Sequence, residues 1–178
     1  MNRNELISQL PKNMVWIELG VFIGDFSKDI FRLTNPSKLY LVDMFPESMI
    51  SGDKDGHNVR TLDLRNVPNE LSSYFDGQPV EIVKSTTTEF LKKMINEKIE
   101  VDCVYIDADH GYHSVKNDLE LSYHVVKSEG YICGHDYHQI HFEGVFRAVN
   151  EFCSEKGLSI EIMSDDVLPT FVIKKEKK

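Results

Sequence analysis

The sequence predicts an α/β fold in which helices cover both faces of a mostly parallel β-sheet. Short apolar runs alternate with longer amphipathic runs along most of the chain, which is the pattern of repeated βα units. Glycines and an Asn-Pro pair punctuate these runs, as expected for segment boundaries. The last two apolar runs have no helical pattern between them. We therefore expect the parallel sheet to end in an antiparallel pair.

The predicted strands are short apolar runs bounded by turn residues. They are residues 15–18, 38–43, 80–84, 101–107, 131–135, 158–163 and 170–174. Repeated βα units of this kind form a doubly wound, Rossmann-like sheet with ligands at the carboxyl ends of its strands. The expected fold is thus a seven-stranded, mostly parallel sheet with an antiparallel C-terminal strand.

The predicted helices have apolar residues at helical spacing. They are residues 25–33, 62–75, 86–97, 114–127 and 143–156. We expect the second helix to break near Pro68, and Thr86 or Thr87 to be the N-cap of the third. The polar stretch 44–58 is interpreted as an active-site loop or lid, because long loops in compact domains are usually functional or disordered.

Length, charge and cysteine content narrow the class of protein. The 178 residues suit a single domain, residues 1–178,. The net charge of -9 argues against a broad phosphate-binding surface, so we expect no nucleic acid partner,. No apolar segment approaches the about 18 residues of a membrane span, and no signal peptide is evident, which predicts no membrane contact and a cytoplasmic location. Three widely spaced cysteines fit free thiols in a reducing compartment,.

Nearly every predicted parallel strand ends in polar or charged residues, and the first is followed by two glycines as well. The residues at these strand ends are Glu18, Gly20, Gly24, Asp43, Ser85, Asp107, Asp109, His110, His135, Asp136, Tyr137 and His138. Because the carboxyl ends of parallel strands meet at one edge of a sheet, we expect these residues to form a ligand site there.

The first turn, from Gly20 to Gly24, distinguishes between two cofactor classes. Dinucleotide binding needs G-x-G-x-x-G with a pyrophosphate at the helix N-terminus. Here the turn lacks that pattern, and Asp25 opens the helix with a charge that would repel phosphate. A cofactor that is cationic near Glu18 fits better, and Asp43 can accept hydrogen bonds from ribose hydroxyls. This favours S-adenosylmethionine over NAD and makes a dehydrogenase improbable.

The motifs resemble those of a known enzyme family. The run V-W-I-E-L-G-V-F-I-G-D looks like motif I of class I S-adenosylmethionine-dependent methyltransferases, and L-Y-L-V-D looks like motif II. The runs Y-I-D-A-D-H-G-Y-H-S-V and G-Y-I-C-G-H-D-Y resemble a small subgroup related to metal-dependent caffeoyl-CoA and catechol O-methyltransferases and to macrolide-sugar and cephalosporin-pathway enzymes. The resemblance spans roughly residues 15–174.

The resemblance implies a role for each candidate residue. Glu18, Gly20 and Gly24 would line the methionine end of S-adenosylmethionine, Asp43 would hold the ribose, Ser85 would lie by the adenine, and Asp107 would border the cofactor. Asp107 and Asp136 match metal ligands for a divalent cation such as Mg or Mn. Asp109 or His135 would complete the ligand set, and His110 would be the general base.

Three functions compete at this point. The first is O-methylation of a hydroxyl on a small molecule or sugar. The second is N-methylation without a metal, and the third is a degenerate protein that binds the cofactor without catalysis. Acceptor recognition would come from the N-terminus, residues 44–60, residues 137–143, or a second subunit in a homodimer.

Overall fold

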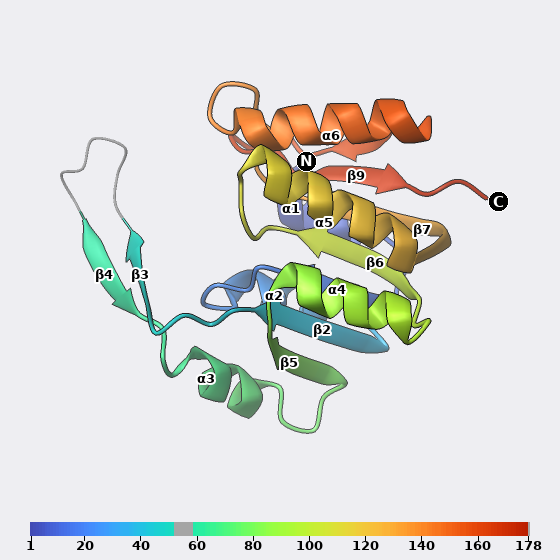
Figure 1. Cartoon of the computed structure of the whole chain (residues 1–178). Helices are drawn as coiled ribbons and strands as arrows, with labels where there is room; N and C mark the ends of the chain where they lie inside the picture. The colour runs from blue at the N-terminus through green and yellow to red at the C-terminus, as the bar shows by residue number, and fades with distance from the viewer. Residues whose placement is uncertain (52–58, 178) are drawn as a thin grey trace.

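The computed structural model, which describes residues 1–51 and 59–177, has a central β-sheet with helices on both faces (Figure 1). The sheet has seven strands in the order β5-β2-β1-β6-β7-β9-β8. They are β1 (Val15–Leu19), β2 (Lys38–Asp43), β5 (Val80–Lys84), β6 (Val101–Ile106), β7 (Val126–Gly134), β8 (Ile160–Met163) and β9 (Phe171–Lys174). The pairings from β5 to β7 are parallel, and β9 runs antiparallel to β7 and β8. The predicted fold class is confirmed.

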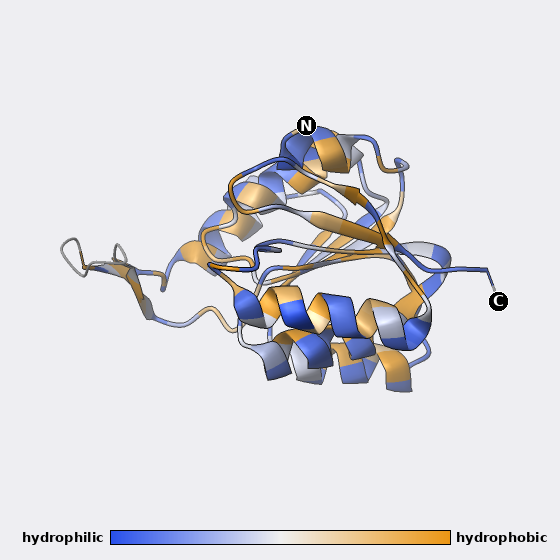
Figure 2. Ribbon diagram, turned by 90° about the horizontal axis from the view of Figure 1, so that it is seen from above, coloured by the Kyte–Doolittle hydropathy of each residue, from blue (hydrophilic) through white to orange (hydrophobic). Residues whose placement is uncertain are grey.

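Two apolar layers hold the helices onto the sheet. The helices are α1 (Arg3–Ser8), α2 (Asp25–Thr34), α3 (Val67–Tyr74), α4 (Thr87–Asn96), α5 (Tyr112–Val125) and α6 (Glu143–Lys156). Side chains of a strand alternate between the faces, so Trp16 packs with α1, α2 and α3, while Ile17 packs with α4, α5 and α6. The apolar residues concentrate in the sheet (Figure 2). Burial on both faces explains why the central strands are mostly apolar rather than alternating between apolar and polar residues.

The predicted helix 62–75 is wrong in its first part. Residues Arg60–Asp63 form β4, which pairs antiparallel with β3 (Ser48–Ser51) in a hairpin that projects from the body (Figure 1). The helix α3 begins only at Val67, so Pro68 lies in its first turn rather than at a break. Proline suits that position because a first-turn N–H has no partner within the helix. The predicted loop 44–58 thus contributes a strand, and its residues 52–58 lie outside the described part of the chain.

The boundary between α5 and β7 also differs from the prediction. The helix ends at Val125 and the strand follows at once. Here Lys175 Nζ donates to the carbonyl oxygens of Tyr123 and Val126, at 2.7 and 2.6 Å. A lysine distant in sequence therefore satisfies the helix end. Sequence periodicity alone contains no signal for such a contact.

Sequence analysis missed α1. Its signal is a capping box, in which the Asn2 side chain accepts from Glu5 N and the Glu5 side chain accepts from Asn2 N, both at 2.9 Å. These two bonds satisfy backbone donors at the start of a helix. Among the described helices, none has the length and apolar character that crossing a bilayer demands.

Candidate active site

A cavity of about 670 Å³ opens at the carboxyl ends of β1, β2, β5 and β6. Gly20, Asp43, Ser85, Asp107 and Asp109 line this cavity, as predicted from their places after the strands. The volume lies within the range typical of small-molecule and cofactor sites. We call it the cofactor cavity below, after the ligand that the sequence analysis predicts for this edge of the sheet.

The turn after β1 approaches the end of β6 very closely at Gly20. A Cβ on Gly20 would lie 2.1 Å from the carbonyl oxygen of Asp107 and 2.6 Å from Ala108 Cα. Its φ of +91° is also a conformation that side chains rarely adopt,. Both constraints require glycine here, and they let the backbone of the turn lie against the end of β6.

The Asp43 carboxylate organises the loops around the cavity. It accepts hydrogen bonds from Val21 N at 2.8 Å and Phe22 N at 3.0 Å through one oxygen, and from Phe45 N at 2.7 Å through the other. Phe22 and Phe45 have positive φ angles of 54° and 42°, which are costly for such side chains. Asp43 therefore stabilises two strained turns, and it has acceptor capacity left for a ligand.

Glu18 and Gly24 were predicted to bind the cofactor, but neither belongs to the cavity lining. Glu18 is buried and accepts a hydrogen bond from the Ser27 hydroxyl. Burial raises its pKa to about 8, although the Ser27 bond opposes the rise. Gly24 is the N-cap of α2, and a Cβ there would lie 2.3 Å from Leu71 Cδ2. Both residues stabilise the turn after β1. Glu18 does so through its buried contact with Ser27, and Gly24 through close packing against Leu71.

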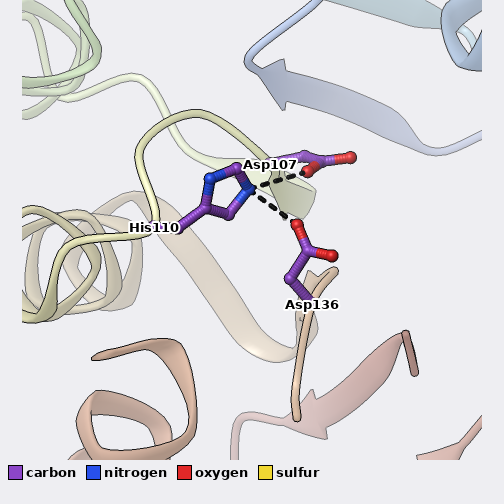
Figure 3. Close-up of side chains that lie close together, drawn as sticks. All are labelled: Asp107, His110 and Asp136. Atoms are coloured by element: carbon purple, nitrogen blue, oxygen red, sulfur yellow. Dashed lines mark ion pairs between the residues drawn. The ribbon is translucent and has the colours of Figure 1, made fainter. Parts of the chain in front are cut away.

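Asp107, His110 and Asp136 form a cluster beyond the ends of β6 and β7 (Figure 3). His110 Nε2 lies 2.6 Å from Asp136 Oδ2 and 3.9 Å from Asp107 Oδ1. His135 Nδ1 lies 3.2 Å from Asp136 Oδ1. The cluster adjoins the cofactor cavity because Asp107 belongs to both.

Opposite charges dominate the electrostatics of the cluster. Asp107 and Asp136 together raise the pKa of His110 to about 10, despite its partial burial. Burial alone would raise the pKa of Asp136, but hydrogen bonds from His110 and His135 outweigh it and hold the pKa well below its usual range. Arg3 adds a guanidinium 3.5 Å from Asp107. In this arrangement His110 is a cation at neutral pH, and its proton stabilises both carboxylates.

The donor set of the cluster fits a divalent cation. Its two carboxylates and one imidazole each offer an atom, and these atoms lie within 4.8 Å of one another. The His135 ring is a further nitrogen donor beside them. Mixed carboxylate and imidazole ligands suit Mn²⁺ and later transition ions better than Mg²⁺, which prefers oxygen. Any such ion would compete with the His110 proton for the same carboxylates.

Asp109 lies apart from this cluster in the described structure. Its carboxylate accepts from Gly111 N at 2.6 Å and from the Ser114 hydroxyl at 3.2 Å, at the start of α5. The sequence analysis named Asp109 or His135 as the further ligand; the structure places His135 beside Asp107 and Asp136 and brings His110 there as well. The loop bearing His110 is held against α6, where a Cβ on Gly144 would lie 2.5 Å from the His110 carbonyl oxygen.

Two parts of the site were not predicted from sequence. Arg3 reaches it from α1, where its guanidinium lies 3.8 Å from the centre of the Phe26 ring. Asp118 lies in the cavity wall on α5 and accepts from the Thr87 hydroxyl at 2.8 Å. An acidic residue inside an amphipathic helix is a detectable signal, because such positions are usually apolar when buried.

Comparison with known proteins identifies the class. A family model described as a methyltransferase domain matches residues 17–137. The chain therefore belongs to the methyltransferase domain family, and it is an S-adenosylmethionine-dependent methyltransferase of class I. A search of curated proteins finds no match.

Solved structures share the fold at low identity. SMU.1697c from Streptococcus mutans, solved in complex with S-adenosylhomocysteine, has a TM-score of 0.65 at 12% identity, covering 97% of this chain and 94% of that chain. The N-methyltransferase NodS from Bradyrhizobium japonicum has a TM-score of 0.65 at 8% identity, covering 98% and 95%. An rRNA methylase from Streptococcus thermophilus has a TM-score of 0.64 at 8% identity, covering 98% and 94%.

The rRNA methylase corrects one sequence-based prediction. We expected no nucleic acid partner because the chain has a net charge of -9. That prediction is wrong as an exclusion, since the same fold is found in an rRNA methylase and in a pre-rRNA processing protein, fibrillarin, from Methanococcus jannaschii. Net charge reports on non-specific phosphate binding, and a local acceptor site does not depend on it.

Proposed function

We propose that this methyltransferase transfers the methyl group to a hydroxyl of an acceptor bound beside the Asp107–His110–Asp136 cluster. The observation that carries the proposal is the position of this cluster, which adjoins the cofactor cavity through Asp107. Methyl transfer is an in-line displacement, so it depends mainly on holding the acceptor oxygen and the sulfonium in line. A charged cluster at the cavity border is suited to orienting a hydroxyl there.

The cofactor would lie along the sheet edge with its methionine part over Gly20 and its ribose at Asp43. Gly20 lines the cavity with backbone atoms alone, so a ligand there would meet no side chain from this position,. The Asp43 oxygen that accepts from Phe45 N keeps acceptor capacity for a ribose hydroxyl,. Glu18 would act from beneath the turn through Ser27, as a positioning residue.

The acceptor side would depend on the protonation of the cluster. His110 Nε2 holds a proton between two carboxylates, which makes it a poor base as long as both of them bind it. A divalent cation held by Asp107, Asp136 and an imidazole would lower the pKa of an acceptor hydroxyl. With His135 as that imidazole ligand, His110 would be displaced from the carboxylates and could receive the hydroxyl proton, in the role of general base.

One observation favours a metal-independent N-methyltransferase as the second candidate. His110 and Arg3 already balance the two carboxylates of the cluster without any further cation. An amine acceptor that loses its own proton to solvent needs no strong base. The two candidates differ in their metal dependence and in the atom that receives the methyl group.

The test combines binding with transfer. Calorimetry with S-adenosylhomocysteine should show binding that does not need a metal. Transfer of a labelled methyl group is then measured to catechols, glycosides, small amines and rRNA, with Mn²⁺ or with a chelator. Labelling of a hydroxyl that the chelator abolishes supports the proposal. Labelling of nitrogen that is unchanged by the chelator would overturn it in favour of the second candidate.

A further inference from the structure

A second cavity, of about 490 Å³, lies beside the Asp107–His110–Asp136 cluster. It is lined by residues 2–4 at the start of α1, by residues 166–168 in the loop between β8 and β9, and by His135. Among the described residues, none lines both this cavity and the cofactor cavity. We call it the α1 cavity. The reaction proposed above assigns it no ligand.

Two side chains of the α1 cavity reach the cluster. His135 Nδ1 lies 3.2 Å from Asp136 Oδ1 and 3.9 Å from Asp107 Oδ1. Arg3 Nη1 lies 3.5 Å from Asp107 Oδ2. Because Asp107 also lines the cofactor cavity, a ligand of the α1 cavity would lie next to the same cluster that borders the cofactor. This is the place where the proposed reaction needs its acceptor.

Hydrogen bonds hold the two walls of the α1 cavity together. Asp165 N donates to the Met1 carbonyl oxygen at 3.0 Å, and Arg3 N donates to Asp166 Oδ2 at 2.7 Å. These bonds join the start of α1 to the loop between β8 and β9. The backbone of Arg3 is therefore positioned by the fold itself, and a preformed site of this kind loses less entropy when it binds a ligand.

The Arg3 guanidinium is fixed in place but keeps donors for a ligand. It lies 3.8 Å from the centre of the Phe26 ring, which supports it from one side,. Its ion pair with Asp107, at 3.5 Å, is longer than the about 2.7–2.9 Å of a direct bond between charged groups,. A guanidinium has five N–H donors, so this one loose contact leaves most of them available in the cavity that Arg3 lines.

The charges around the α1 cavity favour a ligand with a single negative charge. Among the described residues that line it, Arg3 is the one permanent cation and Asp166 the one acid. The two oxygens of a carboxylate match the planar fork of a guanidinium. A phosphate monoester carries nearly two charges at neutral pH, and both Asp166 and Asp107 would repel the second. The cavity thus suits a carboxylate better than a phosphate.

We infer that the α1 cavity binds the methyl acceptor and that this acceptor carries a carboxylate, which the Arg3 guanidinium binds. The inference rests on the proposed function, because it names the chemical class of the acceptor whose hydroxyl lies at the cluster. The hydroxyl receives the methyl group, and the carboxylate serves only for binding. His135 would contact the acceptor between these two groups, since it lines the cavity and reaches Asp136.

The test measures how matched probes bind to the full chain loaded with S-adenosylhomocysteine. Protocatechuate is compared with its amide, and glycerate with its amide, so the members of each pair differ in the charge of one group. Calorimetry should show the acid bound about 10- to 100-fold more tightly than its amide in at least one pair, the scale of a hydrogen bond to a charged group. Arg3→Gln should reduce this preference to about twofold or less.

Further variants separate ligand binding from a structural role of Arg3. Arg147→Gln is the matched control and should keep the wild-type preference. Arg147 also lies 3.8 Å from an aromatic ring, that of Tyr112, and 3.5 Å from a carboxylate, that of Glu151, but it lines neither cavity. Arg3→Lys keeps the charge without the fork and should show an intermediate preference. Should Arg3→Gln not fold, Arg3→Lys and the wild-type preference still decide.

The affinity for S-adenosylhomocysteine is the second measurement. It should stay within about twofold of the wild-type value in both Arg3 variants, because the inference gives Arg3 a role toward the acceptor alone. A purely structural role of Arg3 would instead weaken the binding of the cofactor, the acids and the amides together. That result would overturn the inference.

The outcomes distinguish this inference from the function on which it rests. Equal binding of acid and amide in both pairs, binding of no probe, or an unchanged preference in Arg3→Gln would overturn the inference. Labelling of a neutral hydroxyl acceptor that a chelator abolishes would then still support the proposed function. Tighter binding of glycerol phosphate than of glycerate would overturn the carboxylate as the recognised group. Acid binding through Arg3, combined with labelling of nitrogen that a chelator does not affect, would support the cavity and its carboxylate but overturn the transfer to a hydroxyl.

Discussion

The two halves of the site satisfy their carboxylates in different ways. On the cofactor side, Asp43 is held by three backbone N–H groups, from Val21, Phe22 and Phe45. On the acceptor side, Asp136 is held by the ionisable side chains of His110 and His135. Backbone N–H groups do not titrate, whereas imidazoles gain and lose a proton. The first half is thus preformed for one ligand, and the second can respond to protons and cations.

The largest effect should come from breaking the preformed half at Gly20. Gly20→Ala places a methyl group against backbone atoms of Asp107 and Ala108 that cannot move aside. We expect a loss of about 3 kcal/mol or more in the free energy of unfolding, measured by denaturant titration, and loss of S-adenosylhomocysteine binding. Gly77→Ala is the control, since its φ is also positive, at +71°, but no atom lies within 4 Å. It should cost about 1–2 kcal/mol, and equal losses in the two variants would contradict the prediction.

Asp43→Ala should break the same half by removing its acceptor. The turns at Phe22 and Phe45 lose their shared partner, and the ribose loses a charged one. We expect S-adenosylhomocysteine affinity to fall by about 1.5–3 kcal/mol, or roughly 10- to 100-fold, in calorimetry. Asp25→Ala serves as control, because Asp25 opens α2 and pairs only at 3.3 Å with Lys28. Unchanged affinity in Asp43→Ala would remove Asp43 from the cofactor site.

A metal titration sharpens the comparison on the acceptor side. Mn²⁺ at about ten times its Kd should stabilise the wild type by roughly 1.4 kcal/mol and raise Tm by about 3–5 °C. Asp136→Ala should abolish this shift while S-adenosylhomocysteine still binds. Asp109→Ala should keep it, because the Asp109 carboxylate is bonded at the start of α5. A lost shift in Asp109→Ala would instead support the ligand role predicted from sequence.

A pH dependence from Glu18 tests the support beneath the first turn. In the unfolded chain this carboxyl ionises near 4.5, whereas burial raises its folded pKa to about 8. Between these values the folded state keeps a proton that the unfolded state has lost, so Glu18 lowers stability as pH rises from about 5 to about 8. Glu18→Gln cannot ionise. The Tm difference between this variant and the wild type should therefore grow toward pH 8. The exposed Glu81→Gln is the control, and its Tm difference should stay constant. A constant difference for Glu18→Gln would count against the prediction.

The sheet was predictable because its strands are buried on both faces. Runs such as 38–43 and 101–107 are short and mostly apolar, so they could be assigned as strands without tertiary information. The polar residues that follow the strands predicted the edge of the sheet at which the site lies, because the carboxyl ends of parallel strands meet there. The hairpin β3–β4 was missed, because its strands are only four residues long, and the apolar residues Met49 and Ile50 are exposed rather than alternating toward a core.

The roles within the site were only partly predictable. Asp43, Gly20 and Asp107 follow strands directly, so topology alone brings them to the cavity. Glu18 lies on β1, and its side chain contacts Ser27 of α2 instead of the cavity, which sequence spacing did not predict. Arg3 and Asp118 reach the site from helices, and only tertiary packing determines that contact.

Strain at the site has a consequence for protein engineering. Phe22, Phe45 and Asp136 all have positive φ angles, of 54°, 42° and 58°, each a cost in stability for a residue with a side chain. Glycine or asparagine would relieve that cost. A selection for heat resistance should therefore enrich these substitutions first, at the positions that shape the cofactor cavity and the charged cluster. Thermostable variants obtained that way are expected to lose ligand affinity, so stability and activity are opposed at these three residues.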